Sequence, residues 1–334
     1  MPARIGSRCV TAAALMAVAS PALAVCVTDM LGFNAALNAA IGSTTTTTIM
    51  VARGTYDASQ QHLVFNSSAA SQGLVDIVGG YSHDCSTRIN NPALTVLDGG
   101  QQSQILYLTS TGPVTVRYLT LQNGSNPQQT GLYISSTKAI IVNYNIIRGN
   151  TSTAGYYAGM SIKGYADIHV DGNLLVGNTA SSGYAAGSVV SVGAVNTYVT
   201  NNTVADNTSG TTACGGLLID SQASGTAYAT NNIFWNNNHC DVAAAVVVLT
   251  NNDFGALFGM SDPSSSGNLH VDPKFNPGVY SLAANSPLLE QGELAPPGGL
   301  PTIDIQGHPR SYMGAVDIGA YERGDKIFND GFDH

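Results

Sequence analysis

A short segment led by glycine recurs every 28 residues along the middle of this chain. Gly131, Gly159, Gly187 and Gly215 open four such segments, and Ala243 opens a fifth at the same spacing. Alternation with a period of two inside each segment is typical of short β-strands that bury one side. We therefore expect the following residues to point into a common interior: Leu132, Ile134, Met160, Ile162, Ser188, Val190, Gly216, Leu218, Ala244 and Val246.

Asparagines repeat in a second register. One set follows an aliphatic residue by three positions, and another closes four of the units; the two sets are Asn145, Asn173, Asn202, Asn232 and Asn252, and Asn150, Asn178, Asn207 and Asn237. Asparagine tolerates left-handed backbone at bends, and its amide can satisfy backbone groups. We therefore expect structural side-chain ladders at the corners of stacked coils rather than ligand sites.

A repeat of this length that holds several strands predicts a solenoid. Val75–Val78, Leu94–Leu97 and Ile105–Leu108 look like earlier coils of the same repeat. We predict an all-β chain folded as a single-stranded right-handed parallel β-helix of roughly seven to nine coils.

The repeat also pairs the cysteines. Cys26, Cys85, Cys214 and Cys240 lie beyond the N-terminal leader, and four cysteines allow three pairings. Cys214 and Cys240 each precede a strand, and those strands begin one coil apart, where Cα atoms lie about 5 Å from each other. We predict the disulfides Cys214–Cys240 and Cys26–Cys85, the second tying the N-terminal segment to the early coils.

Both ends of the chain differ from the repeat. Residues 1–24 have a basic start, an apolar run and an A-x-A ending at Ala24, which predicts a secretory signal peptide. Residues 25–268 are expected to form the β-helix with an N-terminal cap. Beyond Leu269 the register is lost and proline recurs, so residues 269–322 should form an irregular last coil and cap, before a polar tail at 323–334.

An open solenoid exposes apolar interior at its ends, which must be covered. Near the N-terminus, Thr28 or Asp29 can cap a helix. Apolar residues spaced along one side of that helix would close the end of the solenoid: Leu31, Phe33, Ala36, Leu37 and Ala40.

Charge and hydropathy limit the possible partners. The net charge is −9, and the few Lys and Arg residues form no cluster, which argues against a nucleic-acid partner. After the leader, no apolar run is long enough for a membrane-spanning helix. We expect a monomer that is secreted, held at the outer cell surface or kept in the periplasm.

Several motifs resemble known bacterial families. Ile49–Tyr56 is similar to the opening strand of pectin-lyase-like β-helix proteins, and two further motifs resemble polymorphic-outer-membrane-protein-like β-helices: Gly79–Ser82 with Asp84–Arg88, and Thr95–Gly100. Four C-terminal motifs are similar to the choice-of-anchor Q domain: Asp272–Phe275, Asn285–Pro287, Asp304–Arg310 and Asp317–Glu322. The resemblance implies a secreted β-helix, mostly of unassigned activity, and Gly324–Asp333 resembles a tail of exported proteins that implies a sorting signal.

Lys163 is the strongest candidate for chemistry on an outer face. Alternation turns it outward, with Ser135 and Ser191 on the adjacent coils and Tyr133 and Ser161 nearby. A glycan could stack on the tyrosine and hydrogen-bond to these serines, which makes the four residues candidate substrate-binding groups.

Asp167, His169 and Asp171 follow Lys163 in the same coil and complete a candidate catalytic group. A lyase needs a base of Lys, Arg or His type, together with Ca²⁺ or another cation, and a hydrolase needs neighbouring acids. The acids do not stack from coil to coil, so we predict a non-catalytic protein that presents a rigid face to extracellular glycans or other partners. No metal or cofactor is expected for that function. The alternative is a polysaccharide lyase or glycoside hydrolase, for which Ca²⁺ would be a possible cofactor.

Overall fold

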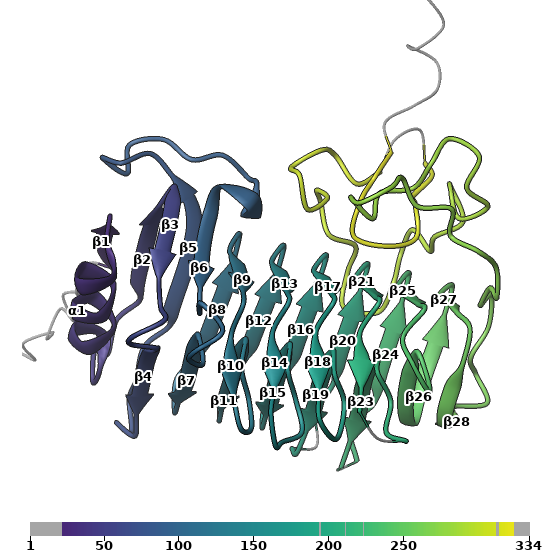
Figure 1. The fold of residues 1–334 in the computed structure, drawn as a ribbon, viewed down its shortest axis with the longest axis horizontal. Helices are drawn as coiled ribbons and strands as arrows, with labels where there is room; N and C mark the ends of the chain where they lie inside the picture. The colour runs from purple at the N-terminus through teal and green to yellow at the C-terminus, as the bar shows by residue number, and fades with distance from the viewer. Residues whose placement is uncertain (1–21, 194, 211, 223, 312–313, 324–334) are drawn as a thin grey trace, which may run out of the picture.

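The chain winds into a right-handed parallel β-helix of about eight turns, with one helix near its N-terminus (Figure 1). The computed structural model describes residues 22–323, apart from residues 194, 211, 223, 312 and 313. The predicted fold class is therefore confirmed. Most of the predicted signal peptide and of the polar tail lies outside the described residues.

Each regular coil adds one strand to each of three faces. The first face contains β4 (Leu63–Ser67), β7 (Leu106–Ser110), β11 (Leu132–Ser136), β15 (Met160–Gly164), β19 (Gly187–Ser191), β23 (Leu217–Ser221) and β28 (Leu257–Ser261). The second face contains β1 (Leu23–Val27), β2 (Thr47–Ala52), β5 (Val75–Tyr81), β8 (Val114–Arg117), β12 (Ile140–Asn143), β16 (Ile168–Asp171), β20 (Thr197–Thr200) and β24 (Ala227–Thr230). Strand β26 (Val242–Thr250) pairs with strands of both faces and joins them into one sheet.

The third face is a separate sheet of β3 (Gly54–Asp57), β6 (Thr95–Asp98), β9 (Thr120–Gln122), β13 (Ile146–Arg148), β17 (Leu174–Val176), β21 (Thr203–Ala205), β25 (Ile233–Trp235) and β27 (Asp253–Phe254). Short strands occupy the corner between the third and first faces: β10 (Ser125–Asn126), β14 (Thr151–Ser152), β18 (Thr179–Ala180) and β22 (Thr208–Ser209). A 3₁₀ turn, η1 (Pro92–Leu94), precedes β6.

The coils differ in length, and this corrects part of the predicted register. The paired residues Leu132, Met160, Gly187, Leu217 and Val242 are 28, 27, 30 and 25 residues apart. A shift of one residue turns every side chain of a strand to the opposite side. The predicted inward set is right in β11 and β15 and at Ala244, and wrong elsewhere. In β19 the inward residue is Val189 instead of Ser188 and Val190, and in β23 the inward residues are Leu217 and Ile219 instead of Gly216 and Leu218. In β26 Val247 is buried, whereas Val246, which was predicted to point inward, is 56% exposed.

The predicted asparagine ladders are confirmed. In the first ladder, Asn202 Nδ2 donates to Asn232 Oδ1 at 2.9 Å and to the Val170 carbonyl at 2.7 Å. Its Oδ1 accepts from the backbone N–H of Asn173 at 2.9 Å. The same bonding repeats from Asn145 to Asn268, one residue further than the sequence predicted. The second ladder joins Asn150, Asn178, Asn207 and Asn237.

The predicted N-terminal helix is present as α1 (Met30–Ala40). Asp29 caps it by accepting a hydrogen bond from the Gly32 N–H at 2.7 Å. Phe33 and Leu37 are fully buried against the first coils, but Leu31 is 82% exposed, so its predicted place on the buried side is wrong. Each residue of a helix turns by about 100°, so Leu31 lies about 160° around the helix from Phe33, on the side opposite the buried stripe.

Both predicted disulfides are present. Cys26 joins Cys85 with a Cα–Cα distance of 5.8 Å, and Cys214 joins Cys240 at 4.7 Å. The second bridge links consecutive coils, as the repeat predicted.

The irregular C-terminal segment folds back along the side of the β-helix. It lies over the third face, above β17, β21 and β25 (Figure 1), and packs Ile305, Ala320, Leu282 and Ile318 on that sheet. Residues 272–323 are called the C-terminal cap below. The cap also reaches the second face, where the Gly298 backbone lies against the Tyr198 ring.

A buried arginine organises the cap. Arg310 is fully buried and donates to the carbonyls of Gly319 at 3.0 Å and Ala320 at 2.9 Å. Its Nη1 also lies 3.6 Å from Glu322 Oε2. Burial raises the pKa of Glu322 to about 8, and the arginine charge opposes that shift. The predicted motifs that end in Arg310 and Glu322 thus meet in one network.

Candidate functional site

Lys163 points outward from β15 on the first face. Its register partner on one side is Ser135, as predicted, but its partner on the other side is Val190 and not Ser191. Ser191 pairs with Gly164 and is fully buried, because the coil between β15 and β19 is one residue shorter than the repeat. Ser191 is therefore not available for substrate binding.

Tyr133 lies one pleat away from Lys163 in the same outward face. Its ring stacks on Tyr107 of the preceding coil, with centroids 4.5 Å apart and planes 12° apart. The next coil places the small side chain of Ser161 at this position, and Ser161 is itself 6% exposed. One face of the Tyr133 ring is thus covered by Tyr107, while the other meets no aromatic neighbour in the strand row. Burial, followed by the Tyr107 hydroxyl, raises the pKa of Tyr133, so its hydroxyl stays protonated.

More tyrosines gather around this row. Tyr157 and Tyr184, in the turns before β15 and β19, stack with centroids 6.3 Å apart. The Lys163 ammonium lies 5.8 Å from the ring centroid of Tyr165, which is 44% exposed. We call the set Tyr107, Tyr133, Tyr157, Tyr165, Tyr184 and Lys163 the tyrosine face.

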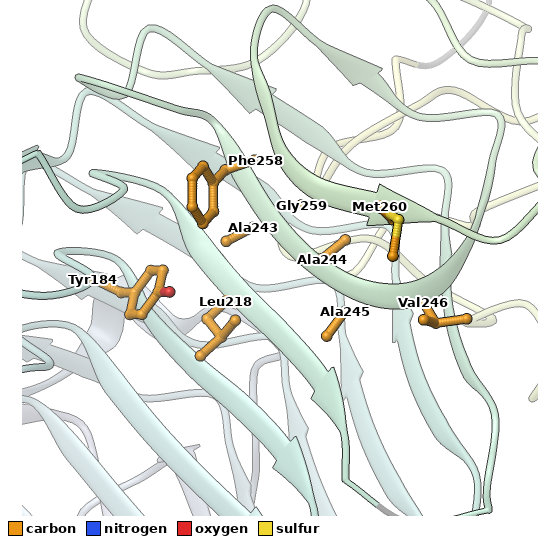
Figure 2. A pocket seen from close by; sticks show the side chains of 9 residues that line it. All are labelled: Tyr184, Leu218, Ala243, Ala244, Ala245, Val246, Phe258, Gly259 and Met260. Carbon is orange, nitrogen blue, oxygen red and sulfur yellow. The ribbon is translucent and has the colours of Figure 1, made fainter.

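The tyrosine face ends at an apolar pocket on the last coils of the first face. The pocket has a volume of about 350 Å³. Figure 2 shows its lining: Tyr184, Leu218, Ala243, Ala244, Ala245, Val246, Phe258, Gly259 and Met260. No lining side chain is charged, and the Tyr184 hydroxyl is their single polar side-chain group.

The predicted catalytic residues do not come together. His169 and Asp171 lie on β16 in the second face, whereas Lys163 is on β15 in the first face. His169 Nδ1 is 3.9 Å from Asp171 Oδ2, while the side chain of Asp167 lies in the turn before β16 and accepts a hydrogen bond from the Asn196 N–H. His169 also packs on Tyr198, which stacks on Tyr228 in the next coil.

The His169–Asp171 contact carries little charge near neutral pH. Burial lowers the pKa of His169 and raises the pKa of Asp171 to about 8, partly offset by a hydrogen bond from Thr200. A protonated Asp171 can donate a hydrogen bond. Asn143, its partner on the adjacent strand, has a buried Oδ1 that accepts none among the described residues.

This carboxyl should make stability fall as pH rises. The folded pKa of Asp171 lies above its ordinary value of 3.8, so the stabilising proton is lost as pH rises toward 8. We expect the free energy of unfolding to fall on the order of 1 kcal/mol per pH unit between about pH 5 and pH 8. Asp171→Asn should remove part of this slope in urea titrations, and the exposed Asp57→Asn should leave it unchanged. An equal slope in wild type and Asp171→Asn would contradict this assignment.

The acids do not match the geometry of a glycoside hydrolase. Asp167 and Asp171 are four residues apart along extended chain, which places their Cα atoms about 13 Å apart. Side chains four residues apart on a strand point to the same face, so their carboxyl groups lie about as far apart as their Cα atoms, whereas the carboxyl groups of such enzymes are roughly 5–9.5 Å apart. Within the described residues, no group of three or more His, Cys, Asp or Glu side chains could hold a metal ion.

Sequence reasoning missed the aromatic partners of the site. Tyr107 and Tyr133, Tyr157 and Tyr184, and Tyr198 and Tyr228 recur 26, 27 and 30 residues apart. These spacings are coil lengths, but a strict period of 28 hides them. The apolar side chains Leu257, Phe258 and Met260 on one short strand were the signal in the sequence that could have indicated the apolar pocket.

Comparisons with known proteins give a family and a solved structure. Residues 32–255 match the family described as "Protein of unknown function (DUF1565)". No curated protein matches. The crystal structure of pectate lyase Pel9A is similar at 13% identity, with 87% of this chain and 91% of that chain covered and a TM-score of 0.35.

Proposed function

Because the chain belongs to the DUF1565 family, whose description assigns no function, we propose from its own surface that it binds extracellular glycans on the tyrosine face. The observation that carries this proposal is the stacked Tyr107–Tyr133 pair, whose last ring is followed by a serine. The C–H face of a sugar can pack on an aromatic ring, while hydroxyl groups and a cation beside it bond the sugar oxygens.

The rigid scaffold suits a repetitive ligand. Rows of outward side chains on successive coils repeat at about 4.8 Å. Thr109, Ser135 and Lys163 form one such row beside the Tyr107–Tyr133 row. A glycan chain lying along the helix axis would therefore meet hydroxyl groups, rings and one ammonium group on a preformed surface, with little ordering cost on binding.

We propose that this binding takes place outside the cytoplasm. Two disulfides are compatible with an oxidising compartment. No helix among the described residues is long and apolar enough to cross a membrane. The motifs of the cap resemble the choice-of-anchor Q domain, and this resemblance, which implies a secreted protein, supports the same proposal.

One observation favours the alternative enzymatic function. Asp171 has a pKa of about 8, so it could serve as a general acid near neutral pH. A lyase or hydrolase would release unsaturated products or new reducing ends from uronate or neutral polysaccharides. Activity lost in Asp171→Asn and kept in Tyr133→Ala would favour that function over binding on the first face.

Tyr133→Ala tests the proposed binding. We expect it to weaken the glycan interaction at least tenfold in affinity electrophoresis against a polysaccharide panel, because it removes the ring that ends the stacked row. Tyr228→Ala is the matched control, since it breaks a stacked tyrosine pair on the second face. Equal loss in both variants, or binding unchanged in Tyr133→Ala, would refute the assigned surface.

A further inference from the structure

The tyrosine face and the apolar pocket form one continuous surface. Tyr184 stacks on Tyr157 at the end of the tyrosine face and also lines the pocket, where it lies beside Leu218 (Figure 2). Leu218 and Ala243 follow Ser188 in the outward strand row that begins with Tyr107 and Tyr133. The polar and the apolar parts therefore lie in sequence along the first face.

Several large apolar side chains of the pocket lining are exposed to solvent. Val246, Phe258 and Met260 are 56%, 66% and 70% exposed. Contiguous apolar groups of this kind mark places where a protein binds apolar matter. Because Tyr184 belongs both to the tyrosine face and to the pocket lining, a ligand that enters the pocket past Tyr184 would pass from polar to apolar surroundings.

We infer that this surface binds an amphiphilic glycan, with its sugar on the tyrosine face and its alkyl or acyl chain in the apolar pocket. The inference rests on the proposed glycan binding and adds the class of ligand. The conjugate could be a glycolipid or a lipid-linked saccharide, which share this chemistry.

The size of the pocket favours a chain over a second protein. Its 350 Å³ lies within the range of small-molecule sites, roughly 300–1,000 Å³. A stable protein interface uses about 20–30 residues on each partner, more than the nine that line the pocket. Two copies with a net charge of −9 each would also repel one another.

An alkyl-length series tests the inference. The probes are n-alkyl β-D-glucosides from methyl to octyl, each kept below its critical micelle concentration, with binding measured by calorimetry. We expect affinity to rise about two- to fourfold per methylene until the pocket is filled. Met260→Lys, a change at a 70% exposed side chain, should flatten the series. The matched control is Leu31→Lys on α1, at an 82% exposed apolar residue far from the pocket, and it should keep the wild-type slope.

Three results would overturn the inference. The first is equal affinity of wild type for methyl and octyl glucoside, and the second is the same slope in Met260→Lys and Leu31→Lys. The third is a dimer in sedimentation that Met260→Lys dissociates, with no dependence on alkyl length; the pocket would then hold a second copy. The proposed function fails on a different result, which is that the polysaccharide panel shows no binding that Tyr133→Ala removes. In that case, a dependence of affinity on alkyl length that is lost only in Met260→Lys would still support the pocket.

Discussion

Asn202→Ala is expected to lower the free energy of unfolding by about 4 kcal/mol or more. The substitution removes the bonds to Asn173, Val170 and Asn232. It leaves the Asn173 N–H without its acceptor and takes one hydrogen bond each from Asn173 Nδ2, the Val170 carbonyl and Asn232 Oδ1, inside a ladder where the neighbouring asparagines are fully buried. An unpartnered buried donor costs about 1–3 kcal/mol, each of the other lost hydrogen bonds costs about 0.5–1.5 kcal/mol, and the cavity left by the side chain adds to this. Urea titration followed by circular dichroism measures the loss.

Asn66→Ala is the control for the ladder. Asn66 is exposed on the first face, where its Oδ1 accepts one hydrogen bond from the Thr109 hydroxyl at 2.8 Å. Its replacement should change stability by no more than about 0.5 kcal/mol. If both variants lost the same stability, the ladder would not be the source of the effect.

Arg310→Met should release the cap while the coils stay folded. Removing one partner of a buried charge network costs about 3–5 kcal/mol, because the remaining groups stay buried without compensation. Here these are the carbonyls of Gly319 and Ala320 and the Glu322 carboxyl. We expect peptides from residues 302–323 to exchange amide hydrogens much faster, with little change in β11, β15 and β19.

The exposed Arg53 supplies the comparison for Arg310. Its Nε donates to the Tyr81 carbonyl at 3.2 Å. Arg53→Met should leave hydrogen exchange in the cap unchanged. Uniformly faster exchange over cap and coils in Arg310→Met would mean that the cap and the β-helix unfold as one unit, contrary to the network described here.

The sequence predicts the scaffold well because its constraints are local and repeated. Asn145, Asn173 and Asn202 stack although their spacing changes by a residue, since a turn absorbs an added residue without moving the ladder. A strand cannot absorb an added or missing residue in this way, because its side chains alternate between two faces. One residue fewer between Met160 and Gly187 was enough to exchange Val190 for Ser191 beside Lys163.

The surroundings of the site depend on contacts between distant segments. The sequence places Asp171 in the same coil as Lys163, but its raised pKa follows from burial, which no local pattern shows. The cap contributes to covering this region, as the contact of Gly298 with Tyr198 shows. The tyrosine face was predicted only at Tyr133 and Lys163, because its other rings come from coils and turns of unequal length.

Hydroxyl-radical footprinting of the tyrosines, with and without a polysaccharide that binds, tests the central proposal most directly. A glycan on the tyrosine face should protect Tyr107, Tyr133 and Tyr165 from oxidation and leave Tyr198 and Tyr228 on the second face as reactive as before. Protection of Tyr198 and Tyr228 without protection of Tyr133 would contradict the proposal and place the glycan beside His169 and Asp171 instead.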